Sequence, residues 1–308
     1  MSVLSLKGRD LLSLADLSQT ELEAVIDLAS SMKSGSVEFR SRKTLGLLFS
    51  KASTRTRVSF SVAMYQLGGQ VIDLNANVTQ IQRGEPVKDT ARVLDRYLDV
   101  LAIRTYAQSE LEDFATYAEI PVINALTDLE HPCQVLADLQ TVKENFNGFE
   151  GLTLAYFGDG NNMVHSLLIG CALVGMNIHV ATPEDFQPDP AVVRQAKEIA
   201  GDRSSILITN DANAAATDVH VLYTDVWASM GQEDSATSRV PVFQPYQIND
   251  ELVKRADPEA IVLHCLPAHR DEEITDSAME GKHSRIWDQA ENRLHAQKAL
   301  LASVLGAE

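Results

Sequence analysis

The sequence predicts an α/β protein built from two doubly wound parallel-sheet domains joined by hinge helices. Two observations support this fold class. Short apolar and β-branched runs alternate with helix-length segments along most of the 308 residues, which is typical of parallel strands covered by helices on both faces. The alternation pauses at a helical stretch, residues 134–146, and then restarts, so that a chain of this length forms two domains of ordinary size.

The first element expected is a helix that begins after Ser18. Glu21 follows Ser18 at the spacing of a capping box, and apolar residues recur at helical intervals until a stop near Gly35. Four strands of the first domain are then expected, separated by helix-length segments, at residues 44–50, 71–75, 100–104 and 121–124.

The second domain is expected to follow the helix at 134–146. Its strands are expected at residues 152–157, 177–182, 205–209, 219–225 and 260–266. Asp288 and Glu291, again at capping-box spacing, indicate the start of a terminal helix that packs back on the first domain.

These elements set the expected domain boundaries. The first domain comprises residues 1–135 together with 288–308, and the second comprises residues 136–287. Residues 229–248 have no regular pattern and are longer than most loops of compact domains, so we expect a loop that closes over a substrate.

Composition excludes several classes of function. The net charge is -17 and no segment is rich in Lys and Arg, so neither nucleic acid nor an anionic membrane is an expected partner. Three cysteines without a Cys-x-x-Cys pair, an N-terminus without an apolar signal-peptide core, and apolar runs too short to span a bilayer favour the cytoplasm. Any anionic substrate must therefore bind in a local basic pocket.

A candidate anion site follows the first strand. Residues 44–50 lead into Ser53-Thr54-Arg55-Thr56-Arg57 and then into a helix, which places backbone N–H groups, hydroxyls and guanidinium groups together. An ordinary N-cap explains Ser53 equally well. Two Arg residues in the first turn favour the anion, because positive charge at a helix N-terminus is unfavourable unless it is neutralised. Arg104 ends the third strand and either points into the same site or is a solvated strand end.

Two further segments carry candidate polar groups. His131 and Gln134 flank Pro132, which suits a first helical position, and they offer an imidazole and an amide to a small carbonyl and its NH2. A capping or core histidine is the alternative. Cys265 lies at the end of the last strand of the second domain. Three roles are open for it: a nucleophile, a polar contact to a ligand, or a small buried apolar residue.

The sequence resembles the aspartate/ornithine carbamoyltransferase family along essentially its whole length. The motifs that carry the resemblance are Ser53-Thr54-Arg55-Thr56-Arg57, His131-Pro132-x-Gln134, Asp225-x-x-x-Ser229-Met230-Gly231 and His264-Cys265-Leu266-Pro267. The first two are shared across the family, and the last two are similar to its ornithine branch. The resemblance implies a carbamoyl phosphate domain followed by an ornithine domain.

The resemblance also implies a role for each matched residue. Carbamoyl phosphate contacts are implied for Ser53, Thr54, Arg55, Thr56, Gln80, Arg104, His131, Gln134, Cys265, Leu266 and Arg293. Ornithine contacts are implied for Asn162, Asp225, Ser229 and Met230. The catalytic residues implied are Arg104, His131, Asp225 and Cys265.

Further expectations follow from the family. Gln80, in the segment 76–88, matches a residue that the family supplies from a neighbouring subunit, so a homotrimer with shared sites is implied. A cis Leu266–Pro267 bond is implied as well. Neither a metal nor an organic cofactor is implied.

The implied reaction is carbamoyl transfer to the δ-amine of L-ornithine, giving L-citrulline and phosphate, in arginine biosynthesis or citrulline catabolism. The amine attacks only when neutral, although a free alkylammonium group has a pKa near about 10, so the site must accept its proton. Asp225 and Cys265 are the candidates that steer this deprotonation. Arg55, Arg104 and His131 would stabilise charge on the carbamoyl oxygen and on the leaving phosphate.

Other functions fit the sequence less well. A nicotinamide-dependent dehydrogenase is suggested by Gly158-Asp159-Gly160 after a strand, but Met163 stands where the third glycine belongs. A serine hydrolase is disfavoured because Trp227 replaces the first glycine of its motif around Ser229. A catalytically silent subunit is disfavoured because the expected site residues are present.

Within the family, three other substrate groups fit the sequence less well. Aspartate is disfavoured because Gln80 replaces an expected Lys and because Asp225 would repel a dicarboxylate. Putrescine and N-acylornithines are disfavoured by Ser229-Met230-Gly231, although the rest of that loop could shift the preference.

Overall fold

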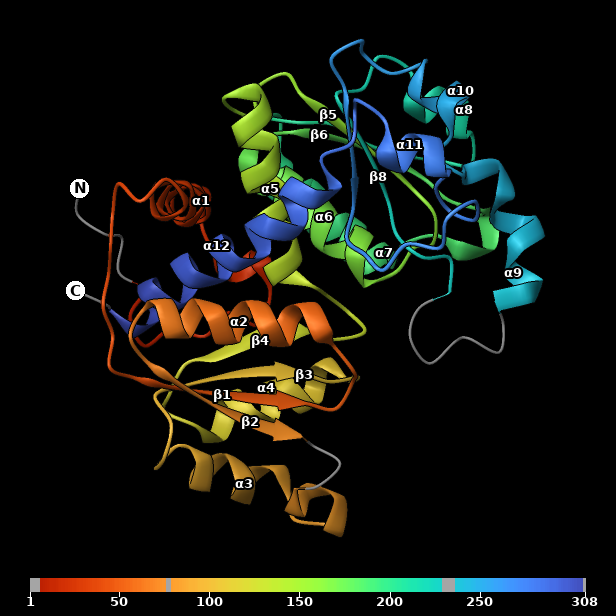
Figure 1. Cartoon of the computed structure of the whole chain (residues 1–308). Coiled ribbons are helices and arrows are strands. Elements are labelled where there is room, and N and C mark those ends of the chain that lie inside the picture. Colours follow the sequence, from red (N-terminus) through yellow and green to blue (C-terminus); the bar gives the residue numbers. More distant parts are fainter. Residues whose placement is uncertain (1–5, 76–78, 229–235, 307–308) are drawn as a thin grey trace. The chain divides into compact units, whose positions relative to one another are not determined.

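The computed structural model describes residues 6–75, 79–228 and 236–306 (Figure 1). The chain divides into two compact units. Unit 1 comprises Met1–Gln140 and Asn292–Glu308, and unit 2 comprises Thr141–Glu291. Each unit has its own parallel sheet, as the alternation of strands and helices predicted.

Unit 1 is built on a four-stranded parallel sheet with the order β2-β1-β3-β4. Its strands are β1 (Thr44–Phe49), β2 (Gln70–Asn75), β3 (Val100–Arg104) and β4 (Val122–Leu126). The chain moves outward from β1 to β2 and then returns to the other side of β1 with β3, so the winding direction reverses between β1 and β3. Ligands of open parallel sheets bind beyond the carboxyl ends of the strands at such a reversal. Phe49 and Arg104 pair there.

Helices cover both faces of this sheet. They are α1 (Gln19–Lys33), α2 (Thr54–Gln66), α3 (Val87–Leu94), α4 (Gln108–Tyr117) and the beginning of α5 (Pro132–Phe146). In Figure 1, α2 lies on one face and α3 on the other. Helix α1 begins as predicted, because Ser18 and Glu21 form a capping box. Helix α5 begins at Pro132, the position proposed for that residue.

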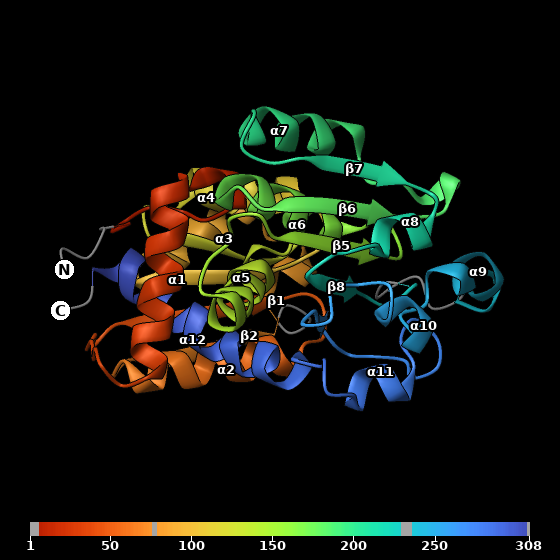
Figure 2. The same cartoon turned by 90° about the horizontal axis from the view of Figure 1, so that it is seen from above.

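Unit 2 is built on a five-stranded parallel sheet with the order β7-β6-β5-β8-β9. Its strands are β5 (Thr153–Phe157), β6 (Asn177–Ala181), β7 (Ile206–Thr209), β8 (Val221–Thr224) and β9 (Ile261–His264). Figure 2 shows β7, β6, β5 and β8 side by side. Here the winding reverses between β5 and β8, so the turns after these two strands flank the expected ligand position.

The helices of unit 2 are α6 (Asn162–Val174), α7 (Pro190–Ala200), α8 (Ala212–Ala216), α9 (Ala236–Phe243), α10 (Asp250–Val253) and α11 (Asp276–Glu280). Apolar residues of β5, β8 and β9 pack against α8, α10 and α11 in one buried cluster that includes Phe157, Leu222 and Val262. None of the described helices of either unit is long and apolar enough to cross a membrane.

Two larger differences from the prediction concern the start of the last helix and the stretch 229–248. The last helix, α12 (Ile286–Leu305), begins before Asp288, so Asp288 and Glu291 lie within the helix rather than at its cap. The stretch 229–248 is not irregular throughout, because α9 occupies part of it and Gln244–Tyr246 forms a short 3-10 helix. A proline inside α9, Pro241, removes the usual helical signal. Residues 229–235, with which that stretch begins, lie outside the described residues.

The described part of the segment 76–88 contains a short helix and the start of a second one. Gln80–Arg83 forms a 3-10 helix, and α3 already begins at Val87. Gln80 is therefore the first residue of a short 3-10 helix.

Candidate active site

The anion-binding motif of unit 1 forms the start of α2. Ser53 is the N-cap, and its hydroxyl accepts a hydrogen bond of 3.3 Å from the Thr56 N–H. Thr54 and Arg55 are exposed at this helix start, whereas Thr56 is buried. The capping role considered for Ser53 is therefore confirmed. It leaves the Thr54 and Arg55 backbone N–H groups at the positive end of the helix dipole.

The two Arg residues of this first turn have different surroundings. Arg57 forms an ion pair with Asp73 of β2, and its guanidinium lies 5.1 Å from the centre of the Phe49 ring. The argument that both arginines need an external anion is therefore wrong for Arg57, whose charge is neutralised within the unit. Arg55 forms no ion pair with any described residue, so it is the cation of this turn that a bound anion would neutralise.

A cavity of about 410 Å³ lies beside this helix start. Its lining residues come from the end of β1, the following turn, α2 and the end of β2, and they are Phe49, Ser50, Lys51, Ala52, Ser53, Thr54, Arg57, Val58 and Asn75. Lys51 is buried there, forms an ion pair with Asp128 and lies 4.3 Å from the centre of the Tyr106 ring. Ser53 and Thr54 are the predicted site residues that face this cavity.

A buried polar network joins three predicted site residues of unit 1. Arg293 of α12 donates from Nη1 to Gln134 Oε1 at 2.5 Å and from Nη2 to Thr56 Oγ1 at 3.0 Å. Gln134 in turn donates from Nε2 to Asp138 Oδ1 at 2.8 Å. The structure therefore brings together residues from α2, α5 and α12. Sequence reasoning missed Asp138, although its position one helical turn after Gln134 was a usable signal.

His131 is buried in a positively charged setting. Its pKa lies well below 6.5, mainly because burial disfavours the imidazolium and further because of the charges of Arg293, Arg104 and Arg55. The charges of these three arginines thus act on the same imidazole. His131 is therefore neutral at physiological pH and offers a hydrogen-bonding imidazole rather than a cation. Neighbouring Cys133 is buried, which raises its pKa to about 12 and makes it an inert thiol.

The neutral state of His131 gives a prediction for nuclear magnetic resonance. We expect its imidazole C2–H signal to stay constant between about pH 6 and 8, where a histidine in a short peptide titrates. The His131→Asn variant assigns the signal. A midpoint near pH 6.5 for that signal would contradict the buried, neutral assignment.

The same shift has a defined effect on stability. The unfolded chain gains a proton at His131 near pH 6.5, whereas the folded protein holds the group neutral to lower pH. Above about pH 6.5 both states hold His131 neutral, so its protonation does not affect the free energy of unfolding. Below about pH 6.5 the unfolded chain binds the proton first, and the free energy of unfolding falls. The free energy of unfolding in urea is measured for the parent protein and for His131→Asn, above and below about pH 6.5. The parent should lose more stability than the variant on going to the lower pH.

Gln80 is exposed on its 3-10 helix. Within the described chain, no hydrogen bond joins it to another predicted site residue. Its predicted role requires a second subunit.

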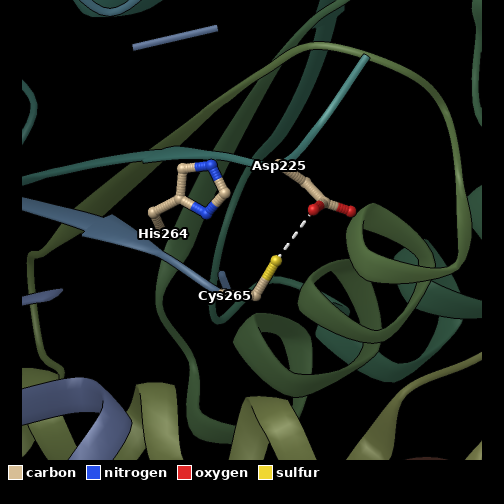
Figure 3. A group of neighbouring side chains, drawn as sticks. All are labelled: Asp225, His264 and Cys265. Carbon is tan, nitrogen blue, oxygen red and sulfur yellow. Dashed lines mark hydrogen bonds between the residues drawn. The ribbon is translucent and has the colours of Figure 1, made fainter. Parts of the chain in front are cut away.

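In unit 2, Asp225 lies at the carboxyl end of β8 and is 7% exposed. Its Oδ1 accepts from Cys265 Sγ at 2.9 Å and from the Val226 N–H at 2.8 Å (Figure 3). Its Oδ2 accepts from Asn161 Nδ2 at 2.9 Å. The structure thus brings the predicted residues Asp225 and Cys265 into direct contact at the ends of neighbouring strands.

Asn161, which was not among the predicted site residues, makes the amide contact to Asp225. Asn161 is the N-cap of α6, where its side-chain oxygen accepts from the Met163 N–H at 2.9 Å, so its amide nitrogen points to Asp225. Asn162 is the first residue of the helix.

The corner after β9 is held by a buried pair. His264 Nε2 lies 2.9 Å from Glu273 Oε1, and its Nδ1 accepts from the Leu266 N–H at 2.8 Å. The Leu266–Pro267 bond is cis, as predicted. Glu273 was missed because it lies beyond the motif. Ligand atoms of Asp225, His264 and Cys265 all lie within 4.8 Å of one another, but hydrogen bonds already engage both His264 nitrogens. The group therefore fits a polar network better than a metal site.

A second charged contact lies beside the Asn161 turn. Arg239 of α9 donates to Asp159 Oδ2 and to the Trp227 carbonyl, both at 2.7 Å. Burial raises the pKa of Asp159, while the Arg239 contact lowers it. These bonds fasten α9 to the turns after β5 and β8. Ser229 and Met230, the remaining predicted ornithine contacts, lie outside the described residues.

Two parallel sheets with polar side chains at the strand ends define an α/β enzyme that handles small charged substrates. Comparison with known families matches the chain to two consecutive domain models. Residues 9–144 match the carbamoyl-P binding domain of aspartate/ornithine carbamoyltransferases, and residues 150–304 match their Asp/Orn binding domain. The chain belongs to the aspartate/ornithine carbamoyltransferase family.

Individual relatives are similar over nearly their full length. The ornithine carbamoyltransferase of Nostoc punctiforme is 67% identical over 304 residues, which cover 99% of both chains. That of Synechocystis sp. is 62% identical over 99% of both chains. Among solved structures, the ornithine carbamoyltransferase from Pyrococcus furiosus matches with a TM-score of 0.95 and 48% identity over 99% of both chains. The one from Gloeobacter violaceus matches with a TM-score of 0.89 and 61% identity over 96% of this chain and 98% of that one.

Proposed function

We propose that this protein transfers the carbamoyl group of carbamoyl phosphate to the δ-amine of L-ornithine, giving L-citrulline and phosphate. The observation that carries the proposal is the identity of 62–67% with ornithine carbamoyltransferases over nearly the whole chain. A buried carboxylate, Asp225, in the unit that matches the Asp/Orn binding domain suits an amine substrate and opposes a dicarboxylate. The protein serves arginine biosynthesis or, in reverse, citrulline breakdown.

Unit 1 supplies the carbamoyl phosphate contacts in this proposal. Arg55 neutralises the phosphate at the α2 start, where Ser53, Thr54 and Thr56 offer hydroxyl and backbone donors. Arg104 and neutral His131 polarise the carbamoyl carbonyl, and Gln134 accepts from the carbamoyl NH2. Arg293 holds Gln134 and Thr56 in one network.

Unit 2 supplies the ornithine contacts and the proton acceptor. Asp225 and Cys265, already hydrogen-bonded to each other, face the amine, while Leu266 at the adjoining corner contacts the carbamoyl group. Asn162, Ser229 and Met230 hold the amino-acid end, and Asn161 orients Asp225.

The steps of the transfer balance without a cofactor. The δ-ammonium group loses a proton, and the neutral amine nitrogen forms a bond to the carbamoyl carbon. The carbon–oxygen bond to phosphate then breaks. Two protons leave the nitrogen: Asp225 and Cys265 steer the first one away before the attack, and the departing phosphate takes the second one as the carbon–oxygen bond breaks. Catalysis is mainly positioning and electrostatic stabilisation.

The quaternary and cellular setting is part of the proposal. We infer a homotrimer in which Gln80 of one subunit reaches the carbamoyl phosphate of the next; the exposed position of Gln80 suits that role. We also infer a cytoplasmic enzyme. No disulfide joins the three cysteines, all of which lie in the described part of the chain. Light scattering in solution tests the trimer.

A parallel substrate assay tests the reaction. We expect citrulline formation from L-ornithine and at least about 10²-fold lower rates with putrescine or aspartate, because an unfilled or repelled charged group is strongly rejected. Carbamoylated product is measured with each amine at equal concentration. Turnover of aspartate alone would overturn the substrate assignment.

A further inference from the structure

The hydrogen bonds around Gln134 extend to a carboxylate that the proposed mechanism does not use. Asp138 lies one turn after Gln134 on α5, and its Oδ1 accepts from Gln134 Nε2 at 2.8 Å. Each of the two side chains is 1% exposed. Among the described residues of unit 1, only Glu130 and Asp138 are buried carboxylates, and Glu130 binds Ser13 and the Leu14 N–H near the N-terminus. Burying a carboxylate is costly without compensation, so its placement beside Gln134 calls for a reason.

The partners of Gln134 determine which way its amide points. An ionised carboxylate only accepts hydrogen bonds, and a guanidinium only donates them. Asp138 therefore requires the amide nitrogen on its side, and Arg293 requires the amide oxygen on the other, where the bond is 2.5 Å. If the amide were flipped by about 180°, its NH2 group would face the Arg293 donors and its oxygen would face the Asp138 carboxylate. Both bonds would be lost.

We propose that Asp138 is a positioning residue for carbamoyl transfer, which acts by fixing the orientation of the Gln134 amide. The inference rests on the proposed function, in which Gln134 Oε1 accepts from the carbamoyl NH2. A carbonyl oxygen has two acceptor sites, so Oε1 serves Arg293 and the substrate together. Arg293 donates to Thr56 at 3.0 Å through its other nitrogen, Nη2, so that bond does not depend on the orientation of the Gln134 amide.

A purely structural role for Asp138 predicts a different result. The same pairing occurs on α1, where Gln19 Nε2 donates to Glu23 Oε1 at 2.8 Å, again one helical turn apart. That pair lies outside the proposed site. Glu23→Ala is thus a matched control that removes the same kind of bond from a helix without altering substrate contacts.

Steady-state kinetics test the inference. We expect Asp138→Ala to raise the KM for carbamoyl phosphate by about tenfold to hundredfold, which corresponds to loss of a hydrogen bond to a charged group. The inhibition constant of inorganic phosphate should stay within about twofold, because phosphate lacks the NH2 that Gln134 binds. Asp138→Asn should recover part of the loss, because its side-chain oxygen still accepts from Gln134. Glu23→Ala should leave kcat and KM unchanged.

A double-mutant cycle shows whether Asp138 acts through Gln134. We expect Gln134→Ala and Gln134→Ala/Asp138→Ala to have nearly the same kcat/KM, because the second change removes nothing further. Additive losses would overturn the inference, as would equal weakening of carbamoyl phosphate and inorganic phosphate. If Asp138→Ala does not fold, the cycle is run with Asp138→Asn. A parent protein that makes no citrulline contradicts the proposed function, whereas an active parent with an unaffected Asp138→Ala variant overturns only this inference.

Discussion

Arg55→Ala is expected to lower kcat/KM for carbamoyl phosphate by at least about 10³-fold, the scale on which arginines act on phosphoryl groups. The reason is that Arg55 is exposed at the α2 start and forms no ion pair with any described residue, so its charge is available to a ligand. Arg55→Lys should recover only part of the loss, because an ammonium group lacks the paired donors that match phosphate.

The neighbouring arginine is the control for this variant. Arg57 belongs to the same helical turn, but its charge is paired with Asp73. Arg57→Ala should therefore lose far less activity than Arg55→Ala. Competitive inhibition by inorganic phosphate reports the anion site directly. Equal losses in the two variants would contradict the distinction between these arginines.

Asp225→Ala is expected to lower kcat/KM for ornithine by about 10²-fold to 10³-fold, the effect of removing one partner of a buried charge pair. The variant also removes the carboxylate that accepts hydrogen bonds from Cys265 and Asn161. Asp225→Asn separates these effects, because it keeps an acceptor oxygen for Cys265 while removing the negative charge.

The expected pattern for Asp225 is specific to one substrate. The KM for ornithine should rise in both variants, and inhibition by inorganic phosphate should stay as in the parent, since the anion motif belongs to unit 1. An unchanged KM for ornithine in Asp225→Asn would refute the electrostatic role of the carboxylate.

Much of the fold could be predicted because its signals are local. Strand 100–104 was predicted with the bounds of β3, and the Ser18 capping box was visible in four consecutive residues. The terminal helix was misplaced because a spacing typical of a cap also occurs inside helices. Helix α9 was missed because Pro241 hides its periodicity.

The motif residues of the site were predictable, but their partners were not. Arg57 and Asp73 lie on different elements, so nothing in the first turn of α2 shows that one of its charges is already neutralised. Asp159 and Arg239 are likewise far apart in sequence. Glu273 follows its motif at a distance, and only the folded corner brings it to His264. Such contacts depend on tertiary packing, which a linear pattern does not encode.

The position of Arg293 has a consequence for how the protein matures. Its two bonds, to Gln134 and Thr56, tie α12 to residues made much earlier. The ribosome must add all of the first 292 residues before this guanidinium exists. A nascent chain that has already formed the four-stranded sheet still lacks this link, so Gln134 and Thr56 are joined through Arg293 only after that part of α12 has been made.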